Sequence, residues 1–117
     1  MAITYIPGTL VGPGGQSETL EFLVDSGATY TVVPESTWRR LGLTAVRSQR
    51  FRLADGTLME RQVGSCAIHL ELGDTVTPVI LGQPGDQPLL GAVTLEELGL
   101  VLNPVSLSLH PASALMA

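Results

Sequence analysis

Short runs of alternating apolar and polar residues, separated by glycines and prolines, make up most of this chain. Such runs predict β-strands that bury one face. In the clearest run, Cys66, Ile68, Leu70 and Leu72 alternate with smaller or polar residues. Two short strands are predicted within the N-terminal segment 1–11, at 3–6 and 9–11. The remaining predicted strands cover residues 19–25, 31–33, 75–81, 89–91, 100–102 and 105–109.

Two short helices and one hairpin interrupt this pattern. Residues 35–41 have a helical apolar face and are followed by Gly42, a typical C-terminal stop. Thr94 and Glu97 have the spacing of a capping box, which predicts a helix at 94–99 with Thr94 as its N-cap. Residues 50–63 predict a hairpin around a tight two-residue Asp55-Gly56 turn, and 111–117 a loose tail. The pattern alone indicates an all-β domain with one or two short helices, either a small barrel or a sandwich.

Composition narrows the class of protein further. The chain has 117 residues, of which 44% are hydrophobic, so we expect a single domain over residues 1–117. The net charge is −5 and no basic stripe is present, which argues against a nucleic-acid partner. No apolar run is long enough to span a membrane, and the single Cys66 cannot form an internal disulfide. We therefore expect a soluble, cytoplasmic protein that does not bind membranes.

Asp25 is the candidate for chemistry. Of the four aspartates in the chain, Asp55, Asp74 and Asp86 each adjoin a glycine in a polar, turn-like setting. Asp25 instead ends an apolar run and enters a glycine turn. Burying a lone carboxylate is costly unless it is paired or protonated, so such a position favours a reactive group. The alternative is an aspartate that caps a strand end, and Asp-Ser-Gly alone fits that alternative better.

Other reactive residue types give no comparable signal. Cys66 lies in an apolar alternation and is expected to be a core side chain. His69 and His110 lack a metal-ligand spacing, and Ser26 lacks the Gly-x-Ser-x-Gly pattern of a serine hydrolase. We therefore predict no metal site and no cofactor.

Three motifs occur in a characteristic order. The segment 24–29 reads Val-Asp-Ser-Gly-Ala-Thr, the Asp55-Gly56 hairpin follows, and Pro-Leu-Leu-Gly at 88–91 leads into the helix predicted at 94–99. In this order the chain resembles the retropepsin-like aspartic proteases, in particular their small bacterial and archaeal single-domain members. The resemblance covers residues 20–104. It implies a small, closed, barrel-like all-β fold.

The resemblance also implies roles for individual residues. Asp25 matches the catalytic aspartate, Ser26 the hydroxyl residue that braces two active-site loops across a dimer, and Gly27 a glycine that contacts substrate. Ala28 completes this active-site loop. The hairpin around residues 53–59 matches the flap that closes over substrate. The implied substrate-binding residues are Val32, Leu53, Ala54, Asp55, Gly56, Thr57, Leu58 and Leu89.

The implied activity is that of an aspartic endopeptidase acting on a peptide or protein substrate. Such hydrolysis needs two carboxylates, and this chain has one such motif, so the resemblance implies a homodimer in which two copies of Asp25 meet. Viral members usually carry Asp where this chain has Thr29 and Arg where it has Ala92, so their stabilising ion pair is absent here. The alternative is a non-catalytic binding or dimerisation module with the same fold.

Overall fold

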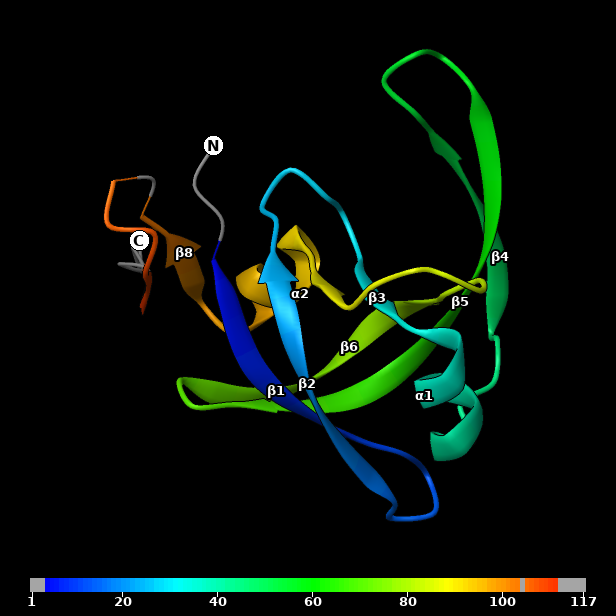
Figure 1. The fold of residues 1–117 in the computed structure, drawn as a ribbon, viewed down its shortest axis with the longest axis horizontal. Helices are drawn as coiled ribbons and strands as arrows, with labels where there is room; N and C mark the ends of the chain where they lie inside the picture. The colour runs from blue at the N-terminus through cyan, green and yellow to red at the C-terminus, as the bar shows by residue number, and fades with distance from the viewer. Residues whose placement is uncertain (1–3, 104, 112–117) are drawn as a thin grey trace, which may run out of the picture.

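The computed structural model describes residues 4–103 and 105–111, which form one seven-stranded sheet, a separate two-stranded sheet and two short helices (Figure 1). The prediction of an all-β fold with short helices is confirmed. In chain order the elements are β1 (Tyr5–Val11), β2 (Ser17–Val24), β3 (Thr31–Val33), α1 (Glu35–Leu41), β4 (Arg47–Arg52), β5 (Leu58–Leu70), β6 (Gly73–Leu81), β7 (Leu89–Leu90), α2 (Ala92–Glu97), β8 (Leu100–Leu102) and β9 (Leu109–Pro111).

The large sheet has the strand order β1-β2-β7-β3-β6-β5-β4, and β1 also pairs with β5. This additional pairing turns the sheet back on itself, so that the alternating faces of several strands meet in one core. Leu10, Phe22, Val33, Ile68 and Leu90 are all fully buried there. The parallel pairing of β2 with β7 brings the ends of these two strands together. That junction is where Asp25 lies.

Local sequence signals predicted α1 and the centre of β5 correctly. Helix α1 covers residues 35–41, and Gly42 ends it in the left-handed conformation with φ of 71°. The Trp38 indole Nε1 donates a hydrogen bond of 2.8 Å to the Gly82 carbonyl and so anchors the helix. In β5 the predicted apolar face is buried at Cys66, Ile68 and Leu70.

Several predicted boundaries were wrong. The N-terminal strands 3–6 and 9–11 form the single strand β1 over the described residues, because Pro7 and Gly8 both pair with β2. Gly8 lies tight against the core, since an added Cβ would come within 2.9 Å of Leu70. Residues 58–70 also form one strand. Leu72, predicted to be buried, lies in the turn after that strand and is 49% exposed.

The C-terminal part differs as well. Val105 and Leu107 were predicted to be in a strand, but they lie in a turn between β8 and β9. The Asn103 side chain accepts hydrogen bonds from the backbone N–H groups of Val105 (2.8 Å) and Ser106 (3.0 Å), which favours this turn over a strand. Of the tail predicted at 111–117, Pro111 ends β9, and residues 112–117 lie outside the described part of the chain.

Candidate active site

Asp25 is the first residue after β2, at the centre of the sheet junction. Its backbone N–H donates to the Leu90 carbonyl at 3.0 Å, which ties the end of β2 to β7. Its side chain is half-buried, and Oδ1 accepts a hydrogen bond of 2.9 Å from the Gly27 N–H. The carboxylate is therefore held on a turn whose geometry both neighbouring segments fix.

Helix α2 is hydrogen-bonded to this turn, and it begins at an earlier residue than predicted. It begins at Ala92, and no side chain caps it, so the capping box at Thr94 was wrong. The first helical amides instead bond to the turn, from Ala92 to the Ala28 carbonyl (2.7 Å) and from Val93 to the Thr29 carbonyl (2.9 Å). The turn thus satisfies the N–H groups that a helix start leaves without partners.

Gly91 makes this close approach possible. A Cβ at this position would lie 2.5 Å from the backbone carbon and 2.6 Å from the oxygen of Tyr30. No side chain fits, because the clash is with backbone atoms that are themselves held in place. The fully buried Leu90 packs beneath the turn. The structure therefore gives a physical reason for the Leu-Leu-Gly motif at 89–91.

A chain of buried threonine hydroxyls connects the site to the core, and the sequence analysis did not find it. Gly91 N–H donates to Thr31 Oγ1 at 3.1 Å. The Thr31 and Thr94 hydroxyls lie 2.6 Å apart, and those of Thr94 and Thr77 2.8 Å apart. All three threonines are at most 1% exposed. The available signal was strand alternation, because Thr77 has the same parity as the buried Val79.

An apolar groove of about 350 Å³ brings together three of the predicted substrate-binding residues, Val32, Leu53 and Leu89. Leu23, on the strand that leads to Asp25, also lines it. The groove thus joins the floor of the sheet to the hairpin β4–β5. Its other lining residues are Phe51, Met59, Arg61, Ile80, Asp86, Gln87 and Pro88.

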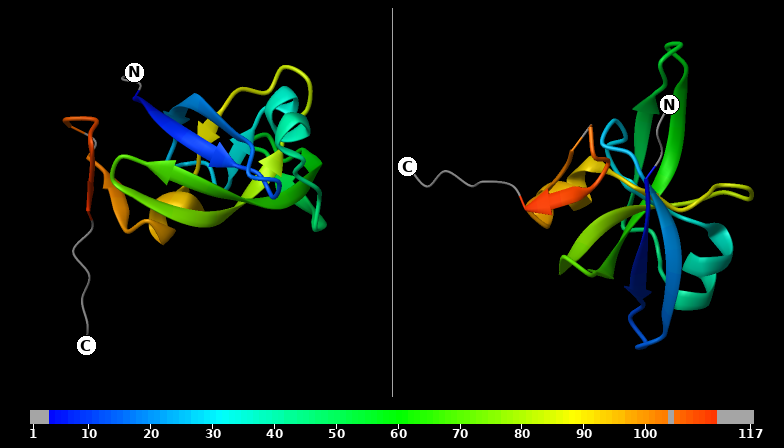
Figure 2. Two further views of the ribbon diagram at one scale, coloured as in Figure 1. Left: turned by 90° about the horizontal axis from the view of Figure 1, so that it is seen from below. Right: turned by 60° about the vertical axis from the view of Figure 1, so that its left-hand side comes forward.

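The hairpin β4–β5 projects beyond the body of the molecule, on the same side as the turn after β2 (Figures 1 and 2). Its loop is longer than the predicted two-residue turn. Leu53 N–H donates to the Thr57 carbonyl at 2.8 Å, and Gly56 takes the left-handed conformation with φ of 87°. The loop residues Ala54, Asp55, Gly56 and Thr57, and the adjoining Leu58, are exposed and do not line the groove.

Ser26 and Gly27 are exposed on the turn, and Ala28 is half-buried. Ser26 lines a different hollow from the groove, one that it shares with Leu95 and with strand β8. The predicted active-site loop therefore borders a second, mainly apolar hollow at Ser26, which is separate from the groove.

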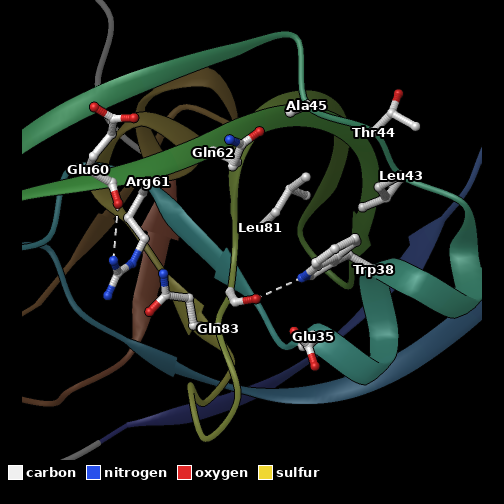
Figure 3. A pocket seen from close by; sticks show the side chains of 11 residues that line it. Glu35, Trp38, Leu43, Thr44, Ala45, Glu60, Arg61, Gln62, Leu81 and Gln83 are labelled. Carbon is white, nitrogen blue, oxygen red and sulfur yellow. Dashed lines mark hydrogen bonds between the residues drawn. The ribbon is translucent and has the colours of Figure 1, made fainter.

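A larger cavity, about 470 Å³, lies between helix α1, strand β5 and the segment after β6 (Figure 3). Its lining includes Trp38, whose indole N–H is already bonded, and it does not include Asp25. Arg61 lines both this cavity and the groove, and it donates to the Glu60 carbonyl at 3.1 Å. Asp25 does not line the groove either, but Leu23, two residues before it, and Leu89, which pairs with Leu23, both do, so we place the candidate site at the groove.

The remaining reactive side chains have structural surroundings. Cys66 is 3% exposed, and burial raises the pKa of its thiol, which favours the unreactive protonated form. His69 forms an exposed pair with Asp74 at 3.0 Å. Within residues 4–103 and 105–111, no group of three or more His, Cys, Asp or Glu is placed to hold a metal ion.

The family model described as aspartyl protease matches residues 6–94, which include the turn, the groove and the hairpin. The chain belongs to the aspartyl protease family. This match agrees with the resemblance that the three ordered motifs carry.

A solved structure supports the same fold for this member of the aspartyl protease family. The solution structure of Simian Foamy Virus (mac) protease has a TM-score of 0.57 and 20% identity, over 81% of this chain and 94% of that chain. At this identity the comparison shows the retroviral protease fold alone. No match to the chain was found among curated proteins. Among the described residues, no helix is both long and apolar enough to cross a membrane.

Proposed function

We propose that the chain is an aspartic endopeptidase that works as a homodimer, with Asp25 of each copy as its catalytic residue. One observation carries this proposal, namely that Asp25 lies on a hydrogen-bonded turn directly after the strand whose Leu23 lines an apolar groove. Because alternate residues along a strand face the same side, we expect the Asp25 carboxylate to face the end of the groove.

The chemistry of the proposal requires a second carboxylate. One ionised carboxylate removes a proton from the attacking water, while a protonated one polarises the scissile carbonyl; aspartic proteases are the established example of this pairing. Asp86 also lines the groove, but its Oδ2 accepts a hydrogen bond of 2.8 Å from Gln83 N–H and so serves its own loop. The partner carboxylate is therefore Asp25 of a second copy.

The groove indicates how substrate binds. An extended peptide fits between the sheet floor and the hairpin, held by backbone hydrogen bonds with its side chains in alternating pockets. The hairpin tip carries Leu53 and Leu58, which are 40% and 53% exposed. Apolar side chains at a projecting tip gain from being covered, which a peptide beneath a closing flap would do. Apolar residues beside the cleaved bond are the expected preference.

The absent viral ion pair does not weaken the turn. At the positions of Thr29 and Ala92, backbone hydrogen bonds from Ala92 and Val93 already join the helix to the turn. The turn and the helix are thus connected without the charges, so the missing ion pair does not argue against the protease.

Cleavage of a diverse peptide mixture, followed by mass spectrometry from acidic to neutral pH, tests the proposal. We expect Asp25→Asn to lower the cleavage rate by roughly 10²–10⁴-fold, because it removes the acid–base group. Asp74→Asn is the matched control and should keep cleaving, since it removes the same charge at an exposed position outside the groove. Wild-type protein that dimerises but cuts nothing would favour the non-catalytic module instead.

A further inference from the structure

Arg61 is the only positively charged side chain among the described residues that line the groove. It lies half-buried on β5, and the other groove-lining residues of the β4–β5 hairpin are the apolar Phe51, Leu53 and Met59. The exposed charges Arg50 and Glu60 of the same hairpin lie outside the groove. A charge among apolar side chains is costly unless it is paired, so the position of Arg61 needs an explanation.

The guanidinium of Arg61 uses few of its N–H donors within the described structure. Its Nη1 donates to the carbonyl of its own neighbour Glu60 at 3.1 Å (Figure 3). Gln49 lies opposite Arg61 on β4, but Gln49 Oε1 accepts a hydrogen bond of 3.0 Å from Arg47 instead. No carboxylate of the described residues forms an ion pair with Arg61. Donors of Arg61 therefore remain available to a ligand.

Two carboxylates share a cavity with Arg61, but each of them interacts with another group. Asp86 lines the groove, and its Oδ2 accepts from the Gln83 N–H in its own loop. Glu35 lines the cavity of Figure 3 and pairs with Arg39 at 3.6 Å. The positive charge of Arg61 thus has no partner of opposite sign among the described residues.

We propose that Arg61 makes the groove selective for peptides with an acidic side chain, whose carboxylate binds the guanidinium. The inference rests on the proposed function, because it takes the groove as the place where a peptide lies. A guanidinium can give two parallel N–H bonds to one carboxylate. A peptide beneath the hairpin also shields Arg61 from water, so a peptide without an acid there leaves a charge unpaired. A basic side chain at the same position adds repulsion.

The acidic side chain is expected at one position of the peptide, away from the cleaved bond. Alternate side chains of an extended peptide face opposite sides, so Arg61 contacts one of them. In the large sheet the strands β7, β3 and β6 lie between β2, which leads to Asp25, and β5, which carries Arg61. The apolar residues Leu23 and Leu89 line the groove at the Asp25 side. Apolar preference beside the cleaved bond and acidic preference further away are therefore compatible.

A series of short apolar peptides tests the proposal, with each position in turn occupied by Glu, Gln or Lys. Binding is measured by fluorescence anisotropy on Asp25→Asn, and cleavage on wild type. At one position we expect the Glu peptide to bind about tenfold more tightly than the Gln peptide, the effect of one hydrogen bond to a charged group. The Lys peptide should bind most weakly. Because the net charge of −5 disfavours acidic peptides in general, such a preference must be local.

Substitutions assign the preference to Arg61. Arg61→Gln in the same background should bind the Glu and Gln peptides equally, and Arg61→Glu should prefer Lys at the same position. This reversal cannot come from a general loss of structure. Arg50→Gln is the matched control, because it makes the same change at an exposed position of the same hairpin outside the groove. It should keep the preference for Glu.

The outcomes separate this proposal from the proposed function. Equal binding of Glu and Gln peptides at every position, no binding of any peptide, or a preference that survives in Arg61→Gln would each overturn the role of Arg61. Asp25-dependent cleavage without an Arg61-dependent preference refutes the selectivity alone. A preference for Glu in binding that Arg61→Gln abolishes, without cleavage by wild type, refutes the protease alone.

Discussion

At the scale of single residues, three buried hydroxyls control the shape of the site. Thr31, Thr94 and Thr77 form one hydrogen-bonded chain that ends at the Gly91 N–H, directly under the Asp25 turn. A buried polar group is stable only while its partners are present. These side chains therefore act as a unit, although none of them touches the proposed substrate groove.

Thr94→Val tests this unit, because valine keeps the shape and removes the central hydroxyl. Two buried hydroxyls then lose a partner, and we expect the free energy of unfolding to fall by about 1–3 kcal/mol. Urea denaturation measures this loss, and exchange of the Gly91 amide should become faster. Thr94→Ser, which keeps the hydroxyl, should restore the Gly91 amide protection.

Thr37→Val is the control for this substitution. Thr37 is also buried, and its hydroxyl donates to Glu18 at 2.9 Å, away from the Asp25 turn. It should lower stability without changing Gly91 exchange or cleavage. Equal stability of Thr94→Val and wild type would contradict the proposed role of the hydroxyl chain.

At the scale of elements, the Asp55 turn sets the conformation of the tip of the β4–β5 hairpin. The Thr57 hydroxyl, and next its backbone N–H at 2.8 Å, lower the pKa of Asp55 below its usual value of 3.8. Because the folded-state pKa of Asp55 lies below its usual value, the carboxylate stays ionised and keeps these hydrogen bonds at a pH where a free aspartate would already be protonated. The hydrogen bonds are lost only as the pH falls through the lower, folded-state pKa. We expect the Thr57 amide resonance to titrate with a midpoint below 3.8.

Nuclear magnetic resonance can follow that titration in wild type and in Asp55→Asn. The variant keeps an acceptor oxygen but has no charge to lose, so its Thr57 resonance should not move over the same range. A wild-type midpoint at or above the usual value would show that the turn does not hold the carboxylate.

The elements also show where sequence reasoning succeeds. Helix α1 could be predicted because its signals are local, with Pro34 before it and a left-handed Gly42 after it. The start of α2 could not, because its first amides bond to carbonyls at Ala28 and Thr29, far away in the sequence. Likewise β1 continues through Pro7 because Pro7 pairs with Glu21 of β2. The short stretch of sequence around each of these elements does not contain its partner.

At the scale of the whole molecule, the order of three motifs predicted a family that 20% identity to a solved relative would not reveal by itself. The groove was predicted only in part. The sequence predicted Val32, Leu53 and Leu89 as substrate-binding residues. Only the structure identified Leu23, Phe51 and Arg61 as part of the groove lining.

The proposed dimer also has a consequence for its dependence on pH. In the proposed dimer the two Asp25 carboxylates would lie in contact, and repulsion between like charges would favour one proton shared between them. Because the dimer binds more protons, dimerisation should weaken as the pH rises. Asp25→Asn removes the shared proton and should dimerise with less dependence on pH.

Sedimentation equilibrium over a pH series measures this difference. Asp86→Asn is the control, since it changes the net charge by the same amount but leaves the dyad intact and should keep the wild-type dependence. General repulsion between chains affects both variants alike, because each loses one of the 11 acidic residues and changes the net charge of −5 by the same amount, so the contrast between them isolates the dyad. If wild type and Asp25→Asn respond identically to pH, the two carboxylates do not meet in the dimer.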